Sequence, residues 1–273
     1  MIAMHKLAGI GAIGIATFKG GLRDRLILSL LLAGFFFLIS TVVFSSFSMR
    51  QPLEVAINYS LATVQLLTIL ITLFLGLNLL SREIETRAGH GVLSQPLSRT
   101  SYLLGKFAGL VLLCCLVVFS LAFCAIAGVL LVKLGEPDQA IYWANFGVSV
   151  LGILLMSLLL GAASLLFSAL ATSAVLPFLA TIAVWFIGQS TQPVKNYLDA
   201  NLADQTITPL LKAIITGAYY FFPNLSLFDF KVYAIYSLPI PAGQVWYALA
   251  YGFVYTAVLL CLATRLFKAQ DML

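Results

Sequence analysis

The sequence predicts an all-α polytopic membrane protein with six transmembrane helices. Of its 273 residues, 62% are hydrophobic and only 9% are charged, and the mean hydropathy is +1.05. Long uncharged runs alternate with short polar breaks, which is typical of helices that cross a bilayer rather than pack around a soluble core. A hydrocarbon core of about 30 Å needs roughly 20 apolar residues per helix, and six runs are close to that length.

The six expected spans are, in order, residues 26–47, 57–80, 105–132, 145–169, 172–188 and 245–267. The first follows basic residues, as in a signal peptide, but no small-residue cleavage site comes after it, so we expect it to stay attached. The junction of the fourth and fifth is only the short stretch "ATS", residues 171–173, at the start of the fifth, which predicts a tight helical hairpin. Residues 208–222 are also apolar, but they are short for a span and contain Lys212, so we expect an interfacial or re-entrant segment there.

The segment before the first span, residues 1–25, is compatible with an amphipathic helix on the cytoplasmic leaflet. The basic residues of this segment lie off one largely apolar helical face. That face is formed by Leu7, Gly11, Ile15, Phe18 and Leu22. Five glycines between Gly9 and Gly21 weaken this helix, at about 1 kcal/mol each in a helix interior. We therefore divide the chain into this N-terminal helix and a transmembrane domain over residues 26–273.

The distribution of basic residues predicts the orientation. Ten of the 15 Lys and Arg residues lie before the first span, around the loop after the second, or at the C-terminal end. The positive-inside rule then places both termini and the loop of residues 81–101 in the cytoplasm. The sequence pI near 9.0 follows from this topology. No nucleic-acid-binding module is recognisable, so we expect no nucleic-acid partner.

The expected spans lack the residues that ion-coupled carriers and enzymes need. Their only charged residues are Lys106 at the start of the third span and Arg265 at the end of the sixth, which disfavours an ion-coupled carrier. His5 and His90 lie outside the spans, and "LLGKF" has Phe107 where a phosphate loop needs Ser or Thr. We expect no catalytic and no metal site, so vectorial work would draw its energy from another chain. The four cysteines, all within expected spans, are Cys114, Cys115, Cys124 and Cys261. We interpret them as small apolar residues that lipid tolerates, and a relay for a soft metal ion is the alternative.

Polar and small residues form stripes on three spans. In the second span Asn58, Gln65 and Thr72 repeat every seven residues, with Thr68 on the same side. Amides are costly against lipid, so this stripe should face protein or a water-accessible path, and both interhelical bonding and a translocation route remain open. Small residues on the fourth and sixth spans predict close helix packing, and a substrate surface is the alternative. These residues are Ser157, Gly161, Ser164 and Ser168 on the fourth span and Ala248, Gly252 and Thr256 on the sixth.

The loop "SREIETRAGHGVLSQPLSRT", residues 81–100, gathers charge that is scarce elsewhere. Its first part continues the second span for about a turn and a half and carries mixed charge: Arg82, Glu83, Glu85 and Arg87. Gly89 and Gly91 bend the chain, and Pro96 with Ser98 sets up the next helix. Such an element can dock a partner and pass its movement to a transmembrane helix. The alternative is a solvated loop whose arginines only enforce topology.

The stretch "SREIETRAGHGVLSQPLSRTSYLLGKFAG" resembles the second-to-third helix region of the ABC-2 family of ATP-binding-cassette transporter permeases. In that family a Glu opens the cytoplasmic coupling helix, a Pro followed by Ser-Arg ends the loop, and Gly-Lys-Phe begins the third span. These features fall on Glu83, Pro96, Ser98, Arg99, Gly105, Lys106 and Phe107. The chain departs from many members at Thr86 and Arg87, followed by "GHG", where those members have a Gly-Thr or similar polar pair.

Further similarity extends over most of the chain. It includes an N-terminal connecting helix leading to "LRDR", a long outer segment with "FPNLSLFDF", and a C-terminal "LFKAQDM". Within this family, the sequence most resembles permeases associated with multicopper enzyme maturation, but it carries no copper-binding signature. The resemblance implies an ABC-2, type V exporter-like permease fold, with an outer re-entrant or interfacial segment over residues 189–244.

The resemblance also implies partners. Many bacterial members lack an ATPase domain, sit in the inner membrane as two permease copies or paralogues surrounded by lipid, and use separate ATPase subunits that bind ATP and magnesium. No cofactor is then expected in this chain. The implied ATPase-coupling residues are Arg82, Glu83, Glu85, Arg87, Pro96 and Arg99. We expect the stripe on the second span to lie nearer the permease dimer axis than the lipid. A non-transporting membrane scaffold that docks a cytoplasmic partner is the alternative.

Overall fold

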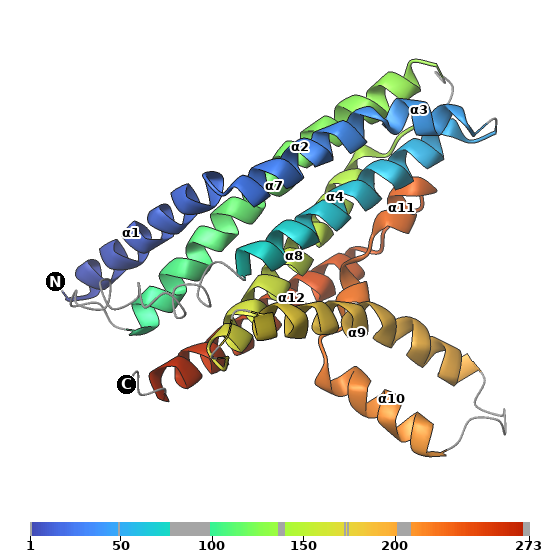
Figure 1. The fold of residues 1–273 in the computed structure, drawn as a ribbon. Helices are drawn as coiled ribbons and strands as arrows, with labels where there is room; N and C mark the ends of the chain where they lie inside the picture. The colour runs from blue at the N-terminus through green and yellow to red at the C-terminus, as the bar shows by residue number, and fades with distance from the viewer. Residues whose placement is uncertain are drawn as a thin grey trace.

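The computed structural model describes residues 2–48, 50–76, 99–135, 140–171, 173, 175–200 and 209–269, and in these residues the regular structure is helical. Six helical stretches are long and apolar enough to cross a membrane, as the sequence predicted. They are Arg25–Ser46, Pro52–Gly76, Thr100–Lys133, Trp143–Ser168, Val175–Ala200 and Ala242–Phe267. The two ends of the chain lie at the same end of the bundle, as an even number of spans requires (Figure 1).

The first span consists of two helices, α2 (Arg25–Ile39) and α3 (Thr41–Ser46). Asp24 caps the start of α2, where its side chain accepts a hydrogen bond of 2.9 Å from the backbone N–H of Leu26. At the junction of the two helices, the Ser40 hydroxyl donates to the carbonyl of Phe37 at 2.7 Å and lies 3.0 Å from the Tyr59 hydroxyl. The break is therefore tied to the next span, α4 (Pro52–Gly76).

The N-terminal helix α1 (Ile2–Leu22) runs beside the first half of α7 (Arg99–Lys133) (Figure 1). Its packing face contains Gly14 and Thr17, whereas Ile15 on the expected apolar face is 52% exposed. A Cβ added at Gly109 of α7 would lie 2.5 Å from the Thr17 Cβ. Glycines that weaken an isolated helix thus allow close approach here, so α1 is stabilised by packing rather than by helix propensity.

Helix α8 (Trp143–Ser168) occupies the centre of the bundle, where it contacts α4, α7, α9 (Val175–Ala200) and α12 (Ala242–Ala269). The small-residue stripe expected to pack is buried throughout: Ser157, Gly161, Ser164 and Ser168. Gly161 receives the side chain of Leu110 from α7, and Ser164 lies against Gly76 at the end of α4. The stripe therefore faces two neighbouring helices and not lipid.

Helix α9 extends further than the sequence indicated. We expected the fifth span to end near residue 188, but α9 continues to Ala200, so residues 189–200 belong to this helix and not to a separate outer segment. Gln192 in the extension has hydrogen-bond partners both within α9 and outside it. Gln192 donates to Asn196 one turn later at 2.8 Å and accepts a bond of 3.1 Å from the Tyr219 hydroxyl of α10 (Pro209–Phe221). Helix α10 has only 13 residues and packs beside α9.

Candidate functional site

Residues 223–241, which we call the connector, join α10 to α12. Its apolar anchors are buried in the bundle, whereas Val232, Tyr236 and Leu238 are exposed. The connector contains a short 3₁₀ helix, η2 (Leu225–Phe228), and the helix α11 (Lys231–Ile235). Its apolar anchors are almost completely inaccessible: Leu225, Phe228, Phe230 and Ala234. Both pieces pack on α8, and α11 also contacts α4. The connector is therefore part of the core of the membrane domain and not a solvated loop.

Glycines on three helices make room for the connector. A Cβ added at Gly188 of α9 would lie 2.6 Å from the carbonyl oxygen of Pro223. A Cβ at Gly152 of α8 would overlap the carbonyl oxygen of Phe228. The ring of Phe228 also lies against Gly252 of α12, 3.1 Å from where a Cβ would stand. Gly252, expected to serve helix packing, thus faces the connector.

Hydrogen bonds from α8 fix both sides of α11. The Asn145 amide donates to the carbonyls of Tyr233 at 2.9 Å and Leu238 at 2.8 Å. The Ser149 hydroxyl donates to the carbonyl of Phe230 at 3.0 Å. These bonds satisfy three backbone acceptors of the connector.

The start of the connector is held by α9 and α12. The Asn224 amide donates to Gln192 Oε1 at 2.7 Å, and the Asn224 backbone N–H donates to the Tyr251 hydroxyl at 2.9 Å. Asn224 is itself only 4% exposed. Three helices, α8, α9 and α12, therefore fix the connector by both shape and hydrogen bonds.

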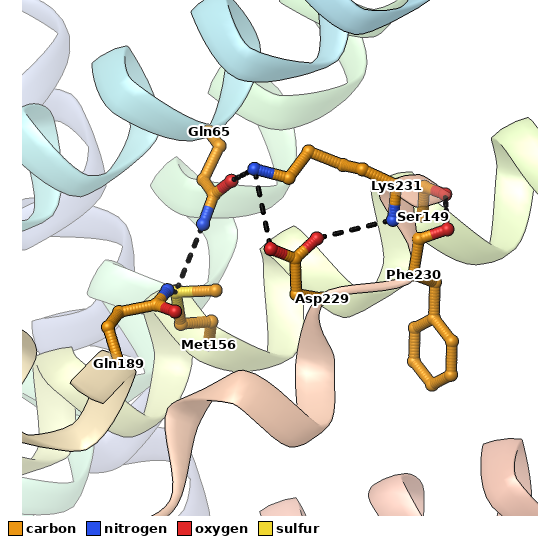
Figure 2. Close-up of polar contacts among 7 residues, drawn as sticks. All are labelled: Gln65, Ser149, Met156, Gln189, Asp229, Phe230 and Lys231. Carbon is orange, nitrogen blue, oxygen red and sulfur yellow. Dashed lines mark hydrogen bonds and ion pairs between the residues drawn. The ribbon is translucent and has the colours of Figure 1, made fainter. Parts of the chain in front are cut away.

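A cluster of five polar or sulfur-containing side chains, which we call the central cluster, joins the connector to α4, α8 and α9 (Figure 2). Its members are Gln65, Met156, Gln189, Asp229 and Lys231. The Lys231 ammonium lies 3.5 Å from an oxygen of Asp229 and donates a hydrogen bond to Gln65 Oε1. The amides of Gln65 and Gln189 both point at the sulfur of Met156, at 3.8 Å and 3.4 Å.

The central cluster lies deep in the bundle. Gln65 and Met156 each lie halfway along their helices, α4 and α8. The side chains of Lys231 and Asp229 retain only 21% and 31% exposure. Charges at such depth are expensive, and here each has an opposite charge beside it, with the Gln65 carbonyl as a further acceptor for the ammonium. The pair is neutral overall, which makes its burial tolerable.

The sequence analysis did not identify Asp229 and Lys231 as site residues, because the stretch around them was read as an outer loop. One signal was available: in "SLFDFKVY" the acid and the base alternate with aromatic residues, which is unusual for a solvated loop. Met156 and Gln189 carried no comparable signal, since an isolated Met or Gln in an apolar helix has no spacing partner.

The stripe on α4 does not act as one unit in this structure. Gln65 belongs to the central cluster, whereas Thr68 and Thr72 are buried further along α4, toward Gly76. The Thr72 hydroxyl donates to the carbonyl of Thr68 at 2.7 Å and lies 3.6 Å from the sulfur of Cys114 in α7. Asn58, one heptad from Gln65, is exposed. The buried part of the stripe therefore makes a contact between α4 and α7 in this structure, and a translocation route remains a prediction.

Most of the predicted coupling residues lie outside the described residues, namely Arg82, Glu83, Glu85, Arg87 and Pro96. The helices that flank them are described. Helix α4 ends at Gly76, α7 begins at Arg99, and the two helices pack against each other. Any movement of the loop between them would therefore act on two helices at the centre of the bundle.

Comparison with known proteins identifies the family. A family model described as "ABC-2 family transporter protein" matches residues 40–272, which is most of the chain. A search of curated proteins found no match. The family match and the six spanning helices agree with each other. The chain therefore belongs to the ABC-2 family of transporter proteins and is a multi-pass, all-helical permease.

Proposed function

We propose that this protein is the transmembrane permease subunit of an ATP-binding-cassette exporter, powered by a separate ATPase subunit at the inner membrane of a bacterium. The observation that carries the proposal is the family match over residues 40–272. The 273 residues contain no phosphate loop, and the proposal places ATP hydrolysis on a separate subunit. ATP and magnesium would then bind to that partner.

The proposed orientation places the N-terminus, the C-terminus and the loop between α4 and α7 in the cytoplasm. Basic residues are concentrated at these positions, in agreement with the positive-inside rule. The connector and the paired helices α9 and α10 then belong to the half of the permease that faces away from the cytoplasm. In this orientation the loop of residues 77–98 is the part of the chain best placed to meet a cytoplasmic ATPase.

We assign the docking of that ATPase to the charged loop. Arg82, Glu83, Glu85 and Arg87 would pair with charges in a groove of the ATPase subunit, and Pro96 with Arg99 would direct the chain into α7. Exposed charge pairs contribute mainly register and association rate, so reversal of two of them should disrupt docking more than stability.

A second permease copy or paralogue would complete the transporter. Large apolar side chains are exposed on the outer faces of α2 and α12, including Leu32, Phe36 and Phe253, and these suit contact with lipid or with a second copy. The exposed Asn58 is the stripe position that a second copy or a water-lined route between copies could reach.

Affinity purification of the tagged protein in mild detergent tests this function. We expect an ATPase subunit to copurify, and we expect the Glu83→Lys, Arg87→Glu double variant to lose it or to lose permease-dependent ATP hydrolysis by at least about tenfold, as loss of close interfacial charge pairs implies. The matched control is Arg50→Glu, Glu54→Lys, which reverses the same charges at the same spacing at the opposite end of α4.

Each outcome of that experiment separates two functions. Retention of the ATPase by the control but not by the loop variant supports power coupling through the loop. If no ATPase and no hydrolysis accompany the wild-type protein, and a different cytoplasmic protein binds the loop instead, the chain is a membrane scaffold and the exporter proposal is wrong.

A further inference from the structure

We propose that Gln65 and Lys231 form a latch through which α4 holds the connector closed, and that displacement of α4 releases it to open the outer side of the permease. This inference rests on the proposed function, because the force on α4 would come from the ATPase. Gln65 and Lys231 are positioning residues in this scheme, since they control the connector without requiring contact with the substrate.

The connector has a different kind of attachment to α4 than to the other helices. On α8, α9 and α12 it is held by glycine contacts and by bonds to backbone or amide groups, as at Gly152, Gly188 and Asn145. The glycine contacts and the bonds to backbone carbonyls change little unless the backbone moves, so they remain even if a side-chain bond such as that of Asn224 to Gln192 is broken. On α4 the attachment includes the hydrogen bond between two long side chains, Gln65 and Lys231 (Figure 2). Such a bond can break and reform by rotamer changes.

Helix α4 is suited to carry movement to this bond. It is continuous from Pro52 to Gly76, with its proline at the first position, where proline does not interrupt a helix. Gln65 lies three turns from Gly76, a distance of about 16 Å at 1.5 Å per residue. The charged loop follows directly after Gly76. A shift of α4 caused at the loop therefore reaches Gln65 as a movement of a rigid rod.

Release of the latch would not leave an isolated charge. When Gln65 moves away, Lys231 retains Asp229, which lies on the same connector at 3.5 Å. The freed amide of Gln65 still faces Met156, whose sulfur is a weak acceptor and a flexible partner. Release of the latch itself therefore costs one hydrogen bond to a charged group, while the bonds from Asn145 and Ser149 of α8 are a separate cost of detaching α11. Loss of the latch bond alone should shift the closed-to-open equilibrium by roughly 10- to 100-fold.

The latch can be tested by measuring how quickly the hidden face of α11 becomes accessible. Ala234 is 4% exposed and belongs to the apolar core that α4, α7 and α8 share with α11, so a cysteine there reports detachment of α11. The probe is Ala234→Cys in the full chain with its four native cysteines replaced by Ala, labelled by a membrane-impermeant maleimide in lipid nanodiscs.

Two substitutions at Gln65 make the test specific. Gln65→Leu removes the acceptor, and we expect labelling to become roughly 10- to 100-fold faster. Gln65→Glu replaces the amide by a carboxylate that binds the ammonium more strongly, and we expect labelling slower than in the wild type. The control Leu66→Ala changes an exposed side chain next to Gln65 on the same helix and should leave the rate unchanged.

The latch proposal is overturned if Gln65→Leu leaves labelling unchanged, or if Gln65→Glu accelerates labelling as much as Gln65→Leu does. The second result would mean that Gln65 only fills space. No ATPase is present in this assay, so its outcome is separate from that of the purification experiment. A working latch in a protein that never binds an ATPase would refute the exporter while leaving the latch in place.

Discussion

Replacement of Asp229 by Ala is expected to destabilise the folded protein by about 3 kcal/mol, the low end of the range for removing one partner of a buried ion pair. The substitution leaves the Lys231 ammonium with Gln65 as its remaining acceptor in the central cluster. The low end applies because the two side chains retain 21% and 31% exposure. The measurement is the midpoint of heat-induced loss of monodisperse protein in detergent.

The control for this substitution removes both charges. In the Asp229→Ala, Lys231→Met double variant no charge remains unpaired, so most of the lost stability should return. A double variant no more stable than Asp229→Ala alone would contradict the assignment, because it would show that Asp229 acts through its own local contacts and not by neutralising Lys231.

Replacement of Gly152 by Val is expected to have the largest effect among the glycines that face the connector. The carbonyl oxygen of Phe228 occupies the place of the new Cβ, and a backbone atom cannot move aside as a flexible side chain can. We expect a loss of about 3 kcal/mol, the upper end of the usual cost of overpacking, and faster labelling of Ala234→Cys as the connector is pushed out.

Gly147→Val is the matched control, because it lies on the same helix and no atom lies within 4 Å of its added Cβ. Both substitutions change helix propensity in the same way, so their difference isolates the contact with Phe228. Equal stability of the two variants would show that the connector does not pack on Gly152 as described.

The number of spans followed from the sequence because it depends on length and composition alone. An apolar run of about 20 residues forms a spanning helix whatever its neighbours are. The end of α9 could not be predicted in the same way. Gln192 and Asn196 give that stretch a polar character. The partners of Gln192 outside α9, Tyr219 and Asn224, become its neighbours only when the chain folds back.

The central cluster was beyond sequence reasoning for a similar reason. Gln65 was singled out, because an amide in an apolar helix is conspicuous. Its partner Lys231 lies 166 residues away in a segment whose aromatic and proline content suggested an interface. Only the tertiary structure shows that glycines on three different helices admit the connector into the bundle. Spacing within one helix cannot reveal such a pocket.

The central claim is that ATP hydrolysis on a separate subunit moves α4 and thereby opens the connector. The most direct measurement is the labelling rate of Ala234→Cys in the purified complex with its ATPase, without nucleotide and after ATP hydrolysis has been arrested by vanadate with ADP bound. We predict that the trapped state labels at a different rate from the nucleotide-free state, and that Gln65→Leu reduces this difference. Equal rates in the two states of a complex that hydrolyses ATP would contradict the account.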